Sequence, residues 1–232
     1  MLRLQWFKLS GLSPAGLRGL AARMLDVRYT SERTWGFFVD DVRPHSLTGR
    51  FVEKELVVQT TEDPFGNSQR FDRTVFNITR FQVDLKRHWV EIHDAPRSLT
   101  PFFSQLAEQS GFLASVEPIY IQPLSWFHSF RKLVPDAMMT KAAIDDFEVA
   151  ESVMARAMLF GEVDVERYIQ TVAGKRRVTA SAIQITFSIE ADLYRLNVSA
   201  AGKIKFLGAA QPDGLELVRN AIPSGSNFNV RQ

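Results

Sequence analysis

The sequence predicts an α+β fold in which mostly antiparallel sheets carry helices packed on one side. Three observations lead to this prediction. Segments typical of strands come in runs, with helical segments between and after them, rather than in a regular strand–helix alternation. The last strand-like segments are joined by connections too short for parallel pairing. With 232 residues, of which 45% are hydrophobic, the chain can form one large domain or two small ones.

The chain begins with an expected strand and an expected helix. In residues 2–9 the apolar side chains alternate with polar ones, which is typical of a strand. Ser13 and Pro14 then indicate a helix start, because a capping side chain is followed by proline at the first helical position. Residues at the 3-4 spacing predict one apolar face of this helix: Leu17, Leu20, Ala21, Met24 and Leu25.

Residues 35–92 are expected to form β structure. β-Branched and aromatic residues are frequent there, and Asp63-Pro64-Phe65-Gly66-Asn67 is a strong turn signal between two strands. A second helix is expected to open at residues 98–101. A strand over residues 116–121 is expected at a sheet edge because Pro118 interrupts it, and a short helix begins at Ser125.

The stretch Val134-Pro135-Asp136 is the predicted domain boundary. It separates an N-terminal α+β domain, residues 1–134, from a C-terminal α+β domain with an antiparallel meander, residues 135–223. Residues 224–232 are rich in Ser, Gly and Asn and are expected to be a flexible tail.

Helices and strands are harder to separate at the start of the C-terminal domain. The periodicity of residues 138–147 fits a strand or a helix. Residues 150–160 are predicted as a helix that stops at Gly161. Asp164 is expected to cap a further helix that ends at Gly174.

The final β region has the clearest pattern in the chain. Ile183, Ile185, Phe187 and Ile189 alternate with polar residues, and residues 194–198 and 203–206 alternate in the same way. Such alternation implies one buried and one solvated face. A last helix is expected over residues 215–222.

The composition excludes several classes of function. The chain has no cysteine, which argues against a disulfide-stapled secreted domain and a structural zinc site and favours a reducing cytosol. The four histidines have no carboxylate partners at metal-ligand spacing, and no glycine-rich phosphate loop is present. No apolar run approaches the roughly 18 residues that span a membrane. We therefore expect a cytoplasmic protein that needs no cofactor, and a binding or scaffold role is favoured over an enzymatic one.

The predicted solvent face of the C-terminal sheet is basic. The formal net charge of +2 is small, but arginine outnumbers lysine 20 to 8, and arginine is well suited to phosphate recognition. These residues could contact phosphates, or could simply be solvated side chains that complement a helix dipole and protect a sheet edge. The candidate residues are Lys175, Arg176, Arg177, Arg195, Lys203 and Lys205.

A second small basic face is predicted on the short helix that begins at Ser125. His128, Arg131 and Lys132 are spaced to lie on one side of it, opposite the aromatic side chains. They either add to a nucleic-acid-binding surface or serve only solubility.

Two further patterns have alternative interpretations. Residues 150–160 and 164–173 have the proportions of a helix-turn-helix unit, although Glu162 and Asp164 would repel a phosphate backbone, so a packed helical hairpin is favoured. An acidic run could hold Mg²⁺ in a metal-dependent nuclease, whereas charge at a helix N-terminus is the simpler interpretation of its last two members. The run consists of Asp145, Asp146, Glu148 and Glu151.

Residues 90–124 resemble one family of phage proteins. A strand at Val90 and Ile92 leads to Leu99-Thr100-Pro101-Phe102-Phe103 and then to Val116-Glu117-Pro118-Ile119. This order is similar to that of the phage exclusion proteins of the RexA type, which have a strand, a Thr/Ser-opened helix and an Ile-Glu-Pro-Leu segment. The resemblance implies a cytoplasmic, dimeric, DNA-binding component of phage defence, and it assigns no catalytic residue.

Together these observations favour a non-enzymatic nucleic-acid-binding protein, with DNA expected ahead of RNA, in an antiviral defence complex. A protein-interaction or scaffold subunit without nucleic-acid contact, which could be a homo-oligomer, is the alternative. A metal-dependent nuclease is the third hypothesis.

Overall fold

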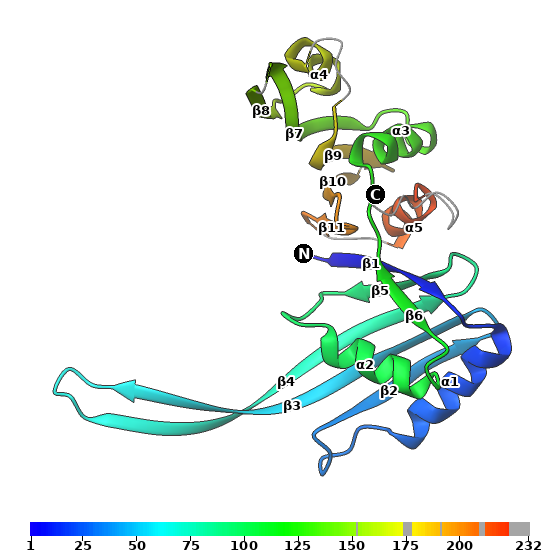
Figure 1. The fold of residues 1–232 in the computed structure, drawn as a ribbon, viewed down its shortest axis with the longest axis vertical. Coiled ribbons are helices and arrows are strands. Elements are labelled where there is room, and N and C mark those ends of the chain that lie inside the picture. Colours follow the sequence, from blue (N-terminus) through cyan, green and yellow to red (C-terminus); the bar gives the residue numbers. More distant parts are fainter. Residues whose placement is uncertain (152, 174–177, 191, 209–211, 223–232) are drawn as a thin grey trace. The chain divides into compact units, whose positions relative to one another are not determined.

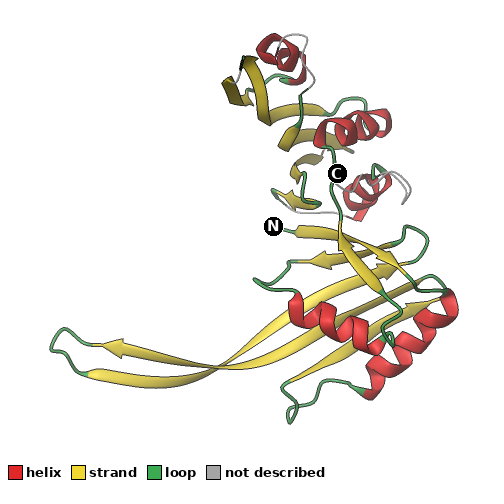
Figure 2. Ribbon diagram, viewed as in Figure 1, coloured by secondary structure: helices red, strands yellow, loops and turns green. Residues whose placement is uncertain are grey.

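The computed structural model describes residues 1–151, 153–173, 178–190, 192–208 and 212–222. Strands dominate it, and five helices accompany them (Figure 1 and Figure 2). Every pair of named strands with a described register is antiparallel. The predicted α+β class is therefore confirmed.

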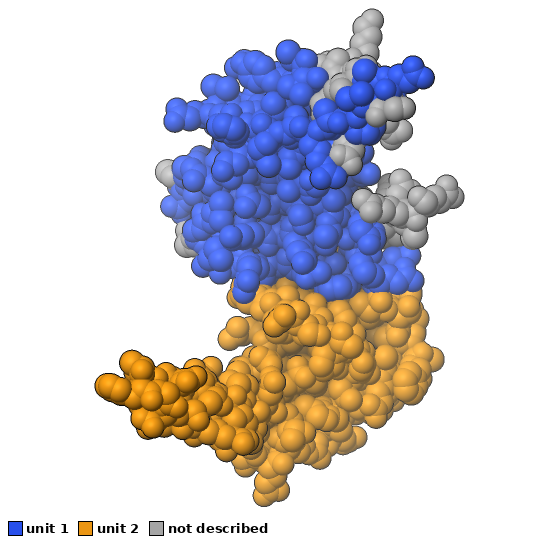
Figure 3. All heavy atoms as spheres, turned by 60° about the vertical axis from the view of Figure 1, so that its left-hand side comes forward, with its two compact units in different colours: residues 1–8, 117–232 blue, residues 9–116 orange. Residues whose placement is uncertain are grey.

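The chain forms two compact units (Figure 3). Unit 1 contains residues 1–8 and 117–232, and unit 2 contains residues 9–116. The predicted boundary after residue 134 lies within unit 1. The expected tail, residues 224–232, lies outside the described residues.

Unit 2 is a four-stranded antiparallel sheet with two helices on one face (Figure 1). The strand order is β2-β3-β4-β5. Its elements are α1 (Pro14–Asp26), β2 (Trp35–Arg43), β3 (Ser46–Glu62), β4 (Ser68–Asp84), β5 (Trp89–His93) and α2 (Thr100–Gln109).

Capping and apolar packing account for the two helices of unit 2. The Ser13 hydroxyl accepts a hydrogen bond from the Gly16 backbone N–H at 3.1 Å, as a helix cap does. The predicted face of α1 is buried except for Leu25, which is exposed at the last turn. In α2, Phe102 packs against Phe51 and Phe81 of the sheet, with ring centroids 6.0 and 5.0 Å apart.

Strands β3 and β4 run together well beyond their neighbours (Figure 1). They pair from Ser46 with Asp84 to Glu62 with Ser68, whereas β2 pairs with β3 only as far as Glu53 and β5 pairs with β4 only as far as Arg80. We call residues 54–76 the arm. The predicted turn at residues 63–67 is its tip, where the Asp63 carboxylate accepts hydrogen bonds from the Phe65 and Asn67 backbone N–H groups.

Unit 1 contains the larger part of the helices and strands. Its strand order is β1-β11-β10-β9-β7-β8, and β6 pairs with β1. The elements are β1 (Arg3–Ser10), β6 (Ser115–Pro118), α3 (Pro123–Leu133), β7 (Met138–Ala150), β8 (Val153–Phe160), α4 (Glu166–Ala173), β9 (Ala180–Ile189), β10 (Asp192–Ser199), β11 (Lys203–Phe206) and α5 (Pro212–Asn220).

The structure decides the ambiguous segment and corrects a second prediction. Residues 138–147 lie in a strand, β7. The helix predicted for residues 150–160 is wrong, because residues 153–160 form strand β8, which pairs with β7. The helix-turn-helix and helical-hairpin interpretations are therefore both excluded. Asp164 does accept a hydrogen bond from the Glu166 backbone N–H, as expected for the start of α4.

The alternation predicted for the C-terminal sheet is confirmed except at Thr186 of β9, which was expected on the solvated face but is buried. Ile183, Ile185 and Phe187 are buried on one face of β9. Helix α3 covers this face, with the Phe130 ring centroid 4.9 Å from that of Phe187. Helix α5 approaches it closely, since a Cβ on Gly214 would lie 2.9 Å from the Tyr194 ring. Among the described helices, none is both long and apolar enough to cross a membrane.

Candidate nucleic-acid interface

A straight row of polar residues crosses five strands of unit 1. Lys141 of β7 pairs with Gln184 of β9, which pairs with Asn197 of β10, then with Lys205 of β11 and Arg3 of β1. Directly opposed residues of antiparallel strands point to the same face. The row therefore presents three cations and two amides, with no carboxylate among its five members.

Two more cations lie on the same face. Lys203 is opposite Gln5, and Arg195 is opposite Thr186, two residues along the strands from the row. We call the side chains of Arg3, Lys141, Arg195, Lys203 and Lys205 the basic face. Its predicted members Arg195 and Lys203 are exposed and Lys205 is half-buried.

The direction of the basic face follows from what lies behind it. Residues of the intervening positions, such as Leu196, Val198 and Ile204, are buried, so the alternate side chains must point to the other side of the sheet. Within the part of the chain that the structure describes, Lys141, Arg195, Lys203 and Lys205 form no ion pair. Their charges are therefore available to an external anion.

Apolar side chains border the basic face at β8. Phe160 is directly opposite Lys141, and Met158 is opposite Ala143. Phe160 is 74% exposed. An exposed ring beside a row of cations and amides is the combination on which bases of single-stranded nucleic acids stack.

The other predicted basic residues have different positions. Lys175, Arg176 and Arg177 lie outside the described residues. His128, Arg131 and Lys132 are on α3, as expected. Lys132 is exposed.

Arg131 and His128 are engaged within unit 1. Arg131 donates to Glu166 Oε2 at 2.5 Å, to Asp164, and to the Ala137 carbonyl oxygen at 3.1 and 3.2 Å. Its guanidinium also lies 4.6 Å from the centre of the Phe127 ring. His128 contacts Glu166 through Nε2. These contacts join α3 to the start of α4, so the two basic side chains have a structural role.

The acidic run lies along β7 except for Glu151, which directly follows the strand. Asp145 and Glu148 are on this strand, and the Asp145 backbone N–H donates to the Thr179 carbonyl at 2.9 Å. Across the described residues, no group of three or more histidine and acidic side chains converges to hold a metal ion. The geometry thus gives the nuclease hypothesis no support.

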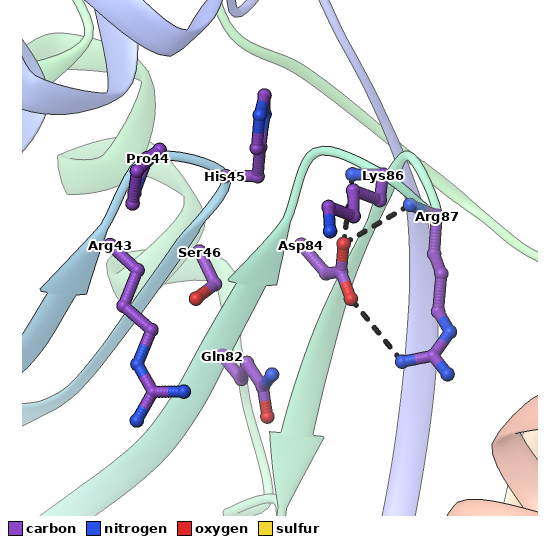
Figure 4. A pocket seen from close by; sticks show the side chains of 8 residues that line it. All are labelled: Arg43, Pro44, His45, Ser46, Gln82, Asp84, Lys86 and Arg87. Atoms are coloured by element: carbon purple, nitrogen blue, oxygen red, sulfur yellow. Dashed lines mark hydrogen bonds and ion pairs between the residues drawn. The ribbon is translucent and has the colours of Figure 1, made fainter.

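Unit 2 contains a basic pocket that sequence reasoning missed. It has a volume of about 590 Å³ and lies where the β2–β3 and β4–β5 turns meet (Figure 4). Its lining combines four basic side chains with one acidic one: Arg43, Pro44, His45, Ser46, Gln82, Asp84, Lys86 and Arg87. In the sequence the turns carry only short polar stretches, and the register that brings them together is a tertiary feature.

Asp84 organises this pocket. Its carboxylate accepts hydrogen bonds from the Lys86 and Arg87 backbone N–H groups at 2.8 and 3.1 Å and from the Arg87 guanidinium at 3.4 Å (Figure 4). Arg43 is held by Asp41 through its Nε at 2.7 Å. The side chains of His45 and Lys86 make no hydrogen bond or ion pair with the residues that the structure describes. The pocket therefore retains positive charge beyond its internal pairs.

No protein-family model and no curated protein matches this chain. The resemblance of residues 90–124 to phage exclusion proteins stays a prediction.

Proposed function

We propose that the protein binds nucleic acid through the basic face of unit 1, and that it prefers single strands. The observation that carries this proposal is the row from Lys141 to Arg3, in which cations and amides cross five strands without an acidic member. With an overall formal charge of only +2, general attraction to a polyanion is weak, so binding depends on where the cations gather.

The preference for single strands follows from shape. A sheet face is too broad for a duplex groove, which admits one helix or a two-stranded ribbon. Unpaired bases can instead lie on the sheet, stack on Phe160 and hydrogen-bond to the amides of Gln184 and Asn197. The expected order of DNA ahead of RNA stays a prediction that the same experiment measures.

Titration of labelled single-stranded DNA, single-stranded RNA and duplex DNA across a salt series tests the proposal. The variant carries Lys141→Glu, Arg195→Glu and Lys203→Glu, all at exposed positions. Its affinity should fall at least tenfold, and its salt slope should fall by about two, since each lost phosphate contact on a single strand removes about 0.7 from the slope.

A matched control separates the basic face from net charge. Arg18→Glu, Arg33→Glu and Arg97→Glu remove the same charge from exposed positions of unit 2. The proposal fails if this control weakens binding as much as the basic-face variant, or if the unaltered protein binds no nucleic acid at low salt.

The pocket of unit 2 is a second position at which a phosphate group could bind, because Lys86 and His45 line it and their side chains have no hydrogen-bond or ion-pair partner among the described residues. Lys86→Glu should weaken binding to about the extent expected for one phosphate contact. An unchanged affinity would restrict the proposed interface to unit 1.

A second candidate function is protein interaction without nucleic-acid contact. The observation that favours it is the arm, which exposes Leu56, Val58, Phe65, Phe71 and Phe76. Large exposed apolar side chains gathered on one element are typical of protein-binding surfaces. A salt series without nucleic-acid binding, together with self-association through the arm, would favour this function.

A further inference from the structure

The arm of unit 2 is a ribbon of two strands that have no further strand beside them among the residues that the structure describes. Beyond Glu53 and before Arg80, β3 and β4 pair only with each other in the described registers. Its apolar side chains are exposed, including Phe65 at the tip (89%) and Leu56 (65%). An isolated two-stranded ribbon is at best marginally stable in water, and a third strand stabilises it.

The backbone of β3 is suited to receive such a strand. Asp63 and Asn67 form a hydrogen-bonded pair at the tip, where the Asp63 N–H donates to the Asn67 carbonyl at 2.9 Å. Because hydrogen-bonded pairs alternate along an antiparallel ladder, the odd-numbered residues of β3 bond to β4. The N–H and C=O groups of Leu56, Val58 and Thr60 therefore point outward from the ribbon. The Lys54 N–H agrees with this alternation, since it donates to the Thr34 carbonyl on the side away from β4.

The sequence of this edge lacks the usual protection against pairing. Natural edge strands carry charges, proline or bulges that block a further strand. Residues 56–61 read Leu-Val-Val-Gln-Thr-Thr, with no charge and no proline, and their register with β4 is unbroken. Charges occur only at the two ends of the segment, with Lys54 and Glu55 at its base and Glu62 at its tip.

These charges are complementary to a second copy of the same segment. We propose that two copies of the chain pair antiparallel along the outer edges of their β3 strands, centred on Val58. Val58 lies four residues from Lys54 and four from Glu62, so each Lys54 is then opposite Glu62 of the second copy, on the same face. The product is a four-stranded sheet in which the two β3 strands are central.

The register is fixed by charge and by the available edge. Backbone pairing can extend only from residue 55 to residue 61, because the Lys54 N–H already donates to the Thr34 carbonyl on this edge and Lys54 is opposite Glu62. Lys54 and Glu62 therefore pair through their side chains alone, and the Lys54 ammonium, which donates to the Ser31 carbonyl at 3.2 Å, has to reach the Glu62 carboxylate. A shift by two residues in either direction separates Lys54 from Glu62. The central pairs are apolar or β-branched, with Val58 opposite Val58 and Leu56 opposite Thr60, which suits strand pairing.

Analytical ultracentrifugation of the nuclease-treated 232-residue protein tests the proposal. The unaltered protein should form a concentration-dependent dimer. Lys54→Glu and Glu62→Lys each place two like-charge pairs in the dimer, so each should raise its dissociation constant on the order of tenfold. An equimolar mixture of the two variants should recover the original affinity, because every pair in the mixed dimer is again of opposite charge.

Two further variants keep the test decisive. Val58→Pro removes an outward N–H without affecting a bond to β4, and it should abolish the dimer while circular dichroism shows an unchanged fold. Arg18→Glu, exposed on α1, is the control and should leave the dimer intact.

A protein that is monomeric at all concentrations overturns the proposal. So does a dimer that persists in Val58→Pro, or one in which the mixed variants fail to recover. This experiment is independent of nucleic-acid binding, so the two proposals can fail separately.

Discussion

At the scale of single residues, Arg131 shows how a position can be predicted correctly and its role missed. Its helical spacing with His128 places both on one face of α3, as expected. The sequence could not reveal that Glu166 and Asp164, more than 30 residues later, lie against that face, since this contact depends on how α4 follows β8. By contrast, the direction of Arg195 and Lys203 was predictable, because a two-residue period decides it locally.

Arg131 is therefore expected to matter for stability more than for binding. Arg131→Ala removes the guanidinium that joins α3 to Asp164 and Glu166, and it should lower the free energy of unfolding by about 2 kcal/mol. Urea unfolding measures this, with Lys132→Ala, which changes an exposed neighbour, as the control within about 0.5 kcal/mol. Nucleic-acid affinity should stay unchanged, and a large loss of affinity in a fully folded Arg131→Ala protein would contradict the structural role.

Glu53 is expected to give stability a pH dependence. Burial and, second, the charge of Glu55 raise the pKa of Glu53 above its ordinary value of 4.5. The folded state then binds the proton more tightly than the unfolded state, so stability falls as pH rises from about 4.5 through the folded-state pKa. Glu53→Gln should raise the free energy of unfolding at pH 7 by less than about 1 kcal/mol, since water screens this partly exposed group.

Denaturant unfolding at several pH values checks this expectation. The difference between Glu53→Gln and the unaltered protein should disappear well below pH 4.5. Glu62→Gln, at an exposed position of the same strand, is the comparison. A difference that grows toward low pH would show that the direction of the pKa shift is wrong.

At the scale of elements, β8 shows the limit of local propensity. Residues 153–160 are rich in Ala, Met and Leu, which favour helices. Pairing with β7 outweighs that preference, and the exposed side chains Met154, Arg156, Met158 and Phe160 then alternate with half-buried ones. The helix α1 and the tip of the arm were predictable because Ser13-Pro14 and Asp63 to Asn67 act on their immediate neighbours.

The arm is expected to add little to the stability of the monomer. Joining Glu55 to Val75 by Asn-Gly replaces residues 56–74 and suits the two-residue turn that closes a hydrogen-bonded pair. Because the removed side chains are largely exposed, the free energy of unfolding of the monomer should change by no more than about 1 kcal/mol. Thermal and urea unfolding measure it, and a loss of several kcal/mol would show that the arm supports the core of unit 2.

At the scale of the whole molecule, the division into units departs from the order of the chain. Val134-Pro135-Asp136 has the composition of a linker, yet α3 before it and β7 after it belong to the same unit. Composition reports the local turn at these residues. It does not report that Phe130 packs on Phe187, which makes the two sides one core.

Fragments can test this division. Residues 117–232 keep α3, whereas residues 135–232 lose the buried rings of Trp126, Phe127 and Phe130. Each such loss costs about 3–5 kcal/mol, against a total stability of roughly 5–15 kcal/mol. The longer fragment should therefore show more cooperative thermal unfolding by circular dichroism than the shorter one. A shorter fragment that unfolds as cooperatively would favour the boundary at residue 134.

The pairing of β1 with β11 also has a consequence during protein synthesis. Lys205, the partner of Arg3, is made about 200 residues after it. At roughly 5–20 residues per second, Arg3 waits on the order of 10–40 s for this partner. Residues 9–116 are complete well before then and can fold first, so unit 1 is expected to close last, around its own beginning.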